Sequence, residues 1–198
     1  TGGRYDPSTD SWTPTSSDGA PSPRMFHSAV WADGRMIVWG GSAPGFVPLA
    51  TGGLYDPVQD SWLPTSLLNV PLARRNHSAV WTGSRVIVWG GASTRSEDTG
   101  GIYDPATDAW NQTAQAGAPQ ARLYHTAVWT GRYMVIWGGY PTLPAFSLTT
   151  GGRYDPGTDS WTPTSTIRTP PPDFLEHRTT AWTGTHMIIW GRPAGGRY

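Results

Sequence analysis

The chain contains no cysteine and no lysine, and its charges cancel. Without cysteine it can form no disulfide, thiolate nucleophile or zinc–thiolate site, and without lysine no Schiff base. Fourteen arginines and 14 acidic residues give a formal net charge of +0, which excludes a field that would attract nucleic acid. No apolar run reaches the length of about eighteen residues that a membrane-spanning helix needs. The 198 residues are enough for one cored domain.

The sequence repeats itself about every fifty residues. The phrase TGGRYDPSTDSW at 1–12 returns at 150–161 with one change, Ser8 to Gly157. A tyrosine followed by Asp-Pro recurs at intervals of 50, 48 and 51 residues, at Tyr5, Tyr55, Tyr103 and Tyr154. All 12 tryptophans fall into three repeated positions. The period predicts an architecture of equal units, each of which is too small to be stable alone.

Each repeat predicts four short strands, called first to fourth below. RMFHSAVW alternates as a half-buried first strand does, and RMIVWGG is an apolar run typical of a buried second strand. GGRYDP is a third strand that stops at an Asp-Pro turn. SWTPT is a fourth strand, which we expect at the sheet edge because Pro14, Pro64 and Pro163 lack an N–H donor. The sequence therefore predicts an all-β fold, a β-propeller of four-stranded antiparallel blades.

The glycine doublet after the second strand, the tyrosine of the third and the tryptophan of the fourth resemble the kelch repeat. The resemblance covers essentially the whole chain in four copies. The repeat sequence GGRYDPxTDSWTPTS is similar to kelch repeats of bacterial proteins, which are often exported. The resemblance implies a kelch propeller located outside the cell or at its surface. It says less about function, since kelch propellers include binding modules, scaffolds and a few enzymes.

We expect residues 1–198 to form a single kelch propeller domain or segment. Residues 1–16 contain only the third and fourth strands of a repeat. Complete repeats of four strands follow at 24–66, 74–113 and 122–165. The chain then has a first and a second strand at 175–191 and the start of a further third strand at 195–198. Three assemblies are open: a four-bladed ring closed by pairing of its two ends, a segment of a longer propeller, and a larger ring shared by two chains. The last four residues repeat the GGRY of 2–5, which favours the segment.

The connections after the second and fourth strands vary in length and sequence, whereas the other turns are alike. Variable loops on a rigid frame commonly carry recognition. We therefore predict a binding face there, with Phe46, Arg95, Tyr140 and Phe146 as contact residues. Leu143 is a further apolar candidate. The alternative interpretation is that these loops only cover the ends of neighbouring blades.

Three arginines precede the first strands in an Arg-x-x-His pattern, and a guanidinium can donate two hydrogen bonds to one carboxylate. Arg24, Arg74 and Arg122 are therefore ligand-binding candidates. Their presence in successive repeats favours a different interpretation, a hydrogen bond that fastens the first strand to its neighbour. In the fourth repeat Arg178 stands where a histidine would be, which disfavours a ring of histidines holding a metal. We predict no metal and no cofactor.

Two further repeated sets have structural interpretations that we favour. The aspartates of the Asp-Pro-x-x-Asp turns could suggest calcium, but such turns cap themselves through side-chain hydrogen bonds and lack the ligand density of a calcium loop. The tryptophans could stack on sugars, but one large ring at the same strand position in every repeat is the natural filler between blades.

The function that we predict is a non-catalytic binding or structural module that recognises a protein or glycan through the variable loops. A second copy of the chain is another possible partner. The alternative is a sugar-acting propeller enzyme of the sialic acid mutarotase type, for which Glu176 and His177 are the residues to mutate. Glu97, His186 and Arg192 also stand outside the repeat pattern. A copper oxidase of the kelch type is excluded because its tyrosine is cross-linked to a cysteine.

Overall fold

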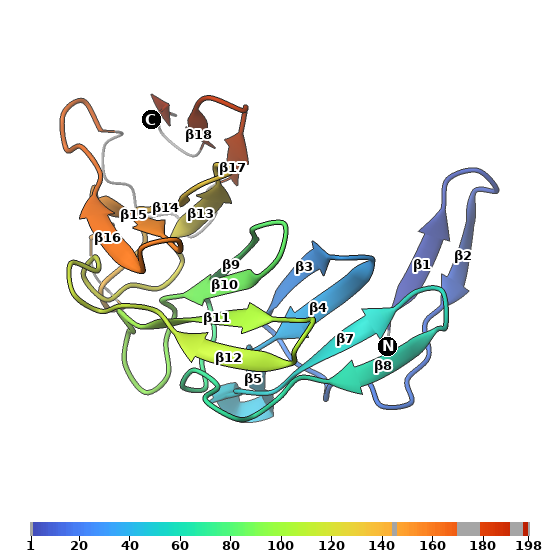
Figure 1. The fold of residues 1–198 in the computed structure, drawn as a ribbon. Coiled ribbons are helices and arrows are strands. Elements are labelled where there is room, and N and C mark those ends of the chain that lie inside the picture. The colour runs from blue at the N-terminus through green and yellow to red at the C-terminus, as the bar shows by residue number, and fades with distance from the viewer. Residues whose placement is uncertain (1, 144–145, 170–178, 191–195, 198) are drawn as a thin grey trace.

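The computed structural model describes residues 2–143, 146–169, 179–190 and 196–197. For residues 196 and 197 it describes the backbone alone. Figure 1 shows antiparallel sheets that follow one another along an open arc. In the described residues the only helical element is a short 3-10 turn, η1 (Pro44–Phe46). The prediction of an all-β chain of four-stranded antiparallel sheets is confirmed.

Three sheets are complete blades, and each follows the order of the sequence from first to fourth strand. The first blade contains β3 (Ser28–Ala32), β4 (Arg35–Trp39), β7 (Gly52–Asp56) and β8 (Ser61–Pro64). The second contains β9 (Ser78–Trp81), β10 (Val86–Trp89), β11 (Gly100–Asp104) and β12 (Ala109–Gln112). The third contains β13 (Thr126–Trp129), β14 (Met134–Trp137), β15 (Gly151–Asp155) and β16 (Ser160–Pro163). A small hairpin, β5 (Ser42–Ala43) and β6 (Val47–Pro48), flanks η1.

Each end of the arc carries a partial blade. The N-terminal ribbon consists of β1 (Gly3–Asp6) and β2 (Ser11–Pro14). The C-terminal sheet consists of β17 (Thr179–Trp182), β18 (Met187–Trp190) and β19 (Gly196–Arg197). Figure 1 places the ribbon and this sheet at opposite ends. The described chain is therefore an open arc and not a ring of four blades closed by pairing of its two ends.

The position of each strand in its blade agrees with its sequence pattern. The first strands β3, β9, β13 and β17 are neighbours in space and form the inner row of the arc. The proline-bearing β8 and β16 are sheet edges, as predicted, because an edge strand can leave one side of its backbone without a ladder. The mixed burial of the first strands and the nearly complete burial of the second strands β10 and β14 agree with the two sequence patterns.

Tryptophans fill the space between blades. Trp39 of the first blade packs on Trp110 of the second, with ring centroids 5.1 Å apart. Trp89 of the second blade packs on Trp161 of the third at 5.2 Å. All four are buried, so the core interpretation is confirmed for these positions, whereas Trp12, Trp31 and Trp190 are more than half exposed and contradict it. Burial of one such ring contributes roughly 4–6 kcal/mol of transfer free energy at about 25 cal/mol per Å².

The glycine doublet is required by close packing at the end of the second strand. Gly41 has φ +89°, a conformation that glycine adopts without strain. A Cβ there would lie 2.7 Å from the carbonyl oxygen of Met25 and 2.8 Å from Cβ of His27. The doublet therefore lets the chain turn out of the second strand directly against the segment that leads into the first.

Candidate functional site

Antiparallel order gives each blade two different ends. The turns from first to second strand and from third to fourth strand lie at one end, called the turn face. The connections after the second strands lie at the other end, called the loop face, and each connection after a fourth strand runs from the turn face of the next blade to its loop face. The repeated Asp-Pro turns lie at the turn face, and the variable loops after the second strands lie at the loop face.

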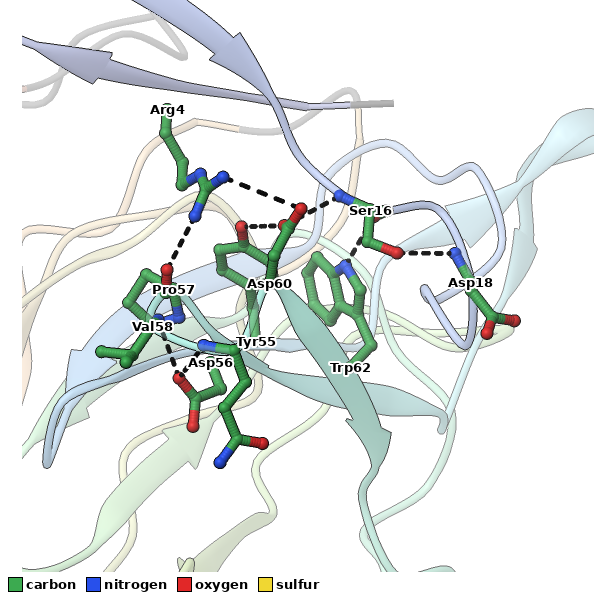
Figure 2. Close-up of polar contacts among 10 residues, drawn as sticks. Arg4, Ser16, Asp18, Tyr55, Asp56, Pro57, Val58, Asp60 and Trp62 are labelled. Atoms are coloured by element: carbon green, nitrogen blue, oxygen red, sulfur yellow. Dashed lines mark hydrogen bonds and ion pairs between the residues drawn. The ribbon is translucent and has the colours of Figure 1, made fainter.

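The aspartates of the turn face are structural. Asp56 accepts the backbone N–H of Val58 at 2.9 Å and so caps its own turn. Asp60 accepts the hydroxyl of Tyr55 at 2.5 Å and the N–H of Ser16, from the preceding ribbon, at 2.9 Å. Figure 2 shows this joint together with the indole of Trp62, which donates to the carbonyl oxygen of Ser16 at 3.0 Å.

The same joint recurs between the complete blades, where Asp108 accepts from Ser66 and Asp159 from Ala114, each at 2.7 Å. The Ser16 N–H, followed by the Tyr55 hydroxyl, lowers the pKa of Asp60. The turn interpretation is therefore confirmed. The described residues contain no group of three or more acidic or histidine side chains that could hold a metal ion.

The arginines before the first strands lie inside the blades. Arg74 donates to the carbonyl oxygens of Gly90 at 3.0 Å and Thr99 at 2.6 Å, and Arg122 makes the same pair of bonds to Gly138 and Thr150. Burial lowers the pKa of both guanidinium groups to about 10, so both stay charged at neutral pH.

These two guanidinium groups hold the base of a loop and are covered by protein. The ligand-binding prediction is therefore corrected for Arg74 and Arg122, which are fully buried. Arg24 makes the equivalent bonds to Gly40 and Thr51 in the partly exposed first blade. The hydrogen-bonding interpretation holds for all three.

The histidines connect neighbouring blades. His77 Nε2 lies 2.9 Å from the hydroxyl of Ser28, and His125 Nε2 lies 2.7 Å from that of Ser78. Burial, followed by the charge of the preceding arginine, lowers the pKa of each ring to about 3. Both imidazoles are therefore neutral at physiological pH and act as structural groups.

The predicted contact residues separate into exposed and buried ones. Phe46 is 57% exposed on the hairpin after β4, and Phe146 is 72% exposed after β14. Arg95 and Leu143 are also exposed on the loop face. For these residues ligand contact stays a prediction.

Tyr140 requires a correction, because it is only 4% exposed and packs with Ala92 and Leu123. It directly follows a glycine doublet, and its backbone exchanges two hydrogen bonds with that of Leu123. This bridge places Tyr140 within the blade and away from the loop surface.

An aromatic and apolar patch on the loop face includes residues that the sequence did not single out. Phe26 stacks on Phe46 with centroids 6.4 Å apart and planes at 16°, and the Arg75 guanidinium carbon lies 5.1 Å from the centroid of Phe46. Exposed Met25 and Val47 flank these rings. We call Met25, Phe26, Phe46, Val47 and Arg75 the Phe46 patch.

Phe26 occupies a backbone position that recurs in each complete blade. Phe26, Asn76 and Tyr124 each directly precede the repeated histidine and have positive φ values of 55–58°. Their backbones form a chain of hydrogen bonds across the blades, from Asn76 N–H to Phe26 and from Tyr124 N–H to Asn76. A phenylalanine at this turned position is exposed, because the backbone directs it away from the first strand.

The residues named for an enzyme do not form a site among the described residues. Glu97 is buried beneath its own loop, where it accepts the hydroxyl of Ser93, and His186 lies on the turn face beside Thr185. The two therefore lie at opposite ends of their sheets. Glu176, His177 and Arg192 lie outside the described residues.

Comparison with protein families gives one match. Residues 54–198 match the model of the KLHDC2/KLHL20/DRC7 Kelch-repeats domain, which is more than half of the chain. No curated protein matches the chain. No helix in the described residues is long and apolar enough to cross a membrane.

Proposed function

We propose, from the premise that the chain belongs to the kelch-repeat domain family of the KLHDC2/KLHL20/DRC7 type, that it is a non-catalytic module whose loop face binds a protein. Kelch domains are typically protein-binding propellers, which favours a protein over a glycan as the partner. We also propose that the chain is located outside the cell or at its surface. This location rests on the similarity of the repeat sequence to that of exported bacterial kelch proteins.

The Phe46 patch is the observation that carries this proposal. Aromatic rings and arginine are the side chains most enriched among the residues that dominate binding energy at interfaces. Phe26 and Phe46 present two stacked rings, and Arg75 places a positive charge over the Phe46 ring. The matching partner segment has an exposed apolar or aromatic side chain next to a carboxylate.

The frame beneath the patch reduces the cost of binding. Arg24 donates to the carbonyl oxygens of Gly40 and Thr51, the two residues between which the β5–β6 hairpin leaves and returns. Leu49 N–H donates to the carbonyl oxygen of Gly41 at 2.8 Å and closes the hairpin base. A loop held in this way loses little conformational freedom when a partner binds.

The proposal is tested by selecting peptides from a displayed random library on the immobilised chain, with counter-selection on a Phe46→Ala/Arg75→Ala variant. We expect the enriched peptides to combine an aromatic or aliphatic residue with Asp or Glu. Loss of one dominant ring costs about 2 kcal/mol, so Phe46→Ala should weaken these peptides about 30-fold.

Leu63→Ala is the matched control, because Leu63 is as exposed as Phe46, at 57%, but lies on the edge strand β8 and not on the loop face. It should leave peptide affinity unchanged. Peptides that bind the Phe46→Ala variant as tightly as the parent chain would overturn the assignment of the binding face.

A further inference from the structure

The charges of the three complete blades are divided unequally between the two faces. Residues 24–165 contain nine arginines and nine acidic residues, so these blades have no net charge. Four of the arginines and seven of the acidic residues belong to the turn face, which gives it a formal charge of −3. The loop face has five arginines and two acidic residues, which gives it a formal charge of +3. Its arginines are Arg24, Arg74, Arg75, Arg95 and Arg122.

The arginines of the turn face have acidic partners, whereas those of the loop face do not. In each complete blade an arginine near the start of the second strand lies beside the aspartate that ends the third strand. These pairs are Arg35–Asp56 at 3.9 Å, Arg85–Asp104 at 3.8 Å and Arg132–Asp155 at 3.2 Å. None of the five loop-face arginines forms an ion pair within the described part of the chain.

Two of the loop-face charges are fixed inside the protein. Arg74 and Arg122 are buried and donate to carbonyl oxygens, which orient the guanidinium groups but have no formal charge to cancel theirs. Glu97 is buried nearby and offsets part of the charge of Arg74, since its carboxylate raises the pKa that burial lowers. Buried charges are screened by salt less than exposed ones. These two arginines therefore contribute to the field of the loop face at physiological ionic strength.

Arg75 and Arg95 bring positive charge to the surface of the loop face. Arg75 is half-buried over the ring of Phe46, and its Nε has no hydrogen-bond partner among the described residues. Arg95 is exposed in the connection after β10. The backbones of Arg75 and Ala92 exchange two hydrogen bonds, so this connection is attached directly to the segment that contains Arg75. The positive surface thus extends from the Phe46 patch onto the next loop.

The negative charge of the turn face does not cancel this field where a partner approaches. The strands that separate the two faces have four or five residues, which corresponds to about 15 Å. The Debye length is about 8 Å at physiological ionic strength. A partner close to the loop face therefore experiences mainly its positive charge, although the chain as a whole is neutral.

The size of this charge suits a short acidic protein segment better than a nucleic acid. Tight binding of a nucleic-acid backbone commonly uses about six to ten contacts between basic side chains and phosphates. Of the five loop-face arginines, two are fully buried and only Arg95 is fully exposed. A segment with a few carboxylates around an apolar side chain matches both this limited charge and the rings of Phe26 and Phe46.

We propose that the partner of the loop face is an acidic protein segment with several carboxylates, and that the charge of this face accelerates its association. The inference rests on the proposed function, which by itself requires only one carboxylate beside an apolar side chain. Complementary charge acts mainly on the rate of association, whereas loss of a packed side chain acts mainly on the rate of dissociation. The field and the Phe46 patch therefore have separate kinetic effects.

The inference is tested on the peptides that are selected against the parent chain, by stopped-flow measurement of their association at NaCl concentrations between about 0.01 and 1 M. We expect the tightest peptides to contain several Asp or Glu residues. Their association should be on the order of tenfold faster at the low-salt end of the series. Phe46→Ala should instead increase the rate of dissociation and leave this salt dependence unchanged.

Two variants make the same charge change on opposite faces. Asp98 is half-buried on the loop face and accepts a hydrogen bond from Nε2 of Gln115 at 3.3 Å, which the amide oxygen of asparagine can also accept. Asp33 is exposed in the turn after β3, with a φ of 48° that asparagine also adopts. Asp98→Asn should increase the association rate about twofold at low salt, because it makes the loop face more positive. Asp33→Asn is the matched control and should leave the rate unchanged.

The outcomes separate the inference from the proposed function. Peptides that depend on Phe46 but associate at the same rate at every salt concentration would overturn the inference and leave the proposed function intact. Equal effects of Asp98→Asn and Asp33→Asn would also contradict it, since they would show a response to net charge alone. Salt-dependent peptides that Phe46→Ala does not weaken would support the field and contradict the Phe46 patch. A short oligodeoxythymidylate that binds more tightly than every selected peptide would refute the assignment of a protein partner.

Discussion

His125 lies with Nε2 2.7 Å from the hydroxyl of Ser78, and its ring is buried edge-on against Trp89. Its Nδ1 is buried and makes no hydrogen bond of good geometry, and the nearby backbone of Trp89 offsets only a small part of the effect of burial on the pKa. A protonated imidazole would need an acceptor at both nitrogens. The joint between the second and third blades therefore depends on a neutral ring, and His77 makes the same joint between the first and second.

Stability should fall in mild acid for this reason. The pKa of His125 is about 3 in the folded chain, below the value of about 6.5 for an unfolded histidine. The unfolded chain thus binds more protons between these values, and the free energy of unfolding decreases as the pH falls through 6.5. The loss should reach about 2 kcal/mol per buried histidine at pH 5.

The measurement is urea unfolding at pH 7.5 and pH 5 of the parent chain and a His125→Gln variant. Glutamine keeps a group that can bond to Ser78 but does not titrate in this range. The variant should be less stable at pH 7.5 and should lose less on acidification. Equal pH dependence in the two chains would show that His125 is not the titrating group.

The repeat pattern predicted the frame of the molecule because each of its signals is local. A proline in the fourth strand, an alternating first strand and a tryptophan at a fixed position each restrict their own segment. Eight-residue spacing between the tryptophans of the first and second strands then defines the hairpin. The structural interpretation of Arg74 and Arg122 was also available, since a residue repeated in each complete blade suits bonds within the blade.

The loop face was less predictable because its contacts join residues that are far apart in sequence. Tyr140 was expected at the surface from its position in a variable loop, but its pairing with Leu123 buries it. Phe26 was missed because its exposure follows from a positive φ that no local residue type demands. Its stacking on Phe46 depends on how the β5–β6 hairpin folds back.

Removal of a buried arginine should cost far more than removal of an exposed one. Arg122→Ala leaves the carbonyl oxygens of Gly138 and Thr150 without their donor in a buried site, and we expect a loss of about 3 kcal/mol or more. Arg132→Ala removes an exposed ion pair with Asp155 and should cost less than about 1 kcal/mol. Denaturant unfolding measures both, and similar losses would contradict the structural role of Arg122.

Two glycine substitutions separate backbone conformation from packing. Gly34→Ala places a methyl group where nothing lies within 4 Å, so it should cost only the strain of a positive φ, about 1 kcal/mol. Gly41→Ala adds a Cβ at 2.7 Å from the carbonyl oxygen of Met25 and should cost at least twice as much. Thermal unfolding checks this, and an equal decrease in Tm would mean that the loop base can shift to accept the methyl group.

Truncation of Trp89 should be costly, because this ring packs on both His125 and Trp161 of the next blade. Trp89→Ala leaves a cavity between the second and third blades, for which we expect a loss of about 3–5 kcal/mol. Trp31→Ala makes the same chemical change at a ring that is largely exposed, so its cost should stay below about 1 kcal/mol. Equilibrium unfolding followed by circular dichroism compares them without relying on tryptophan fluorescence. If Trp31→Ala proved as destabilising as Trp89→Ala, burial between the complete blades would not be the main source of stability, because the exposed ring lacks that packing.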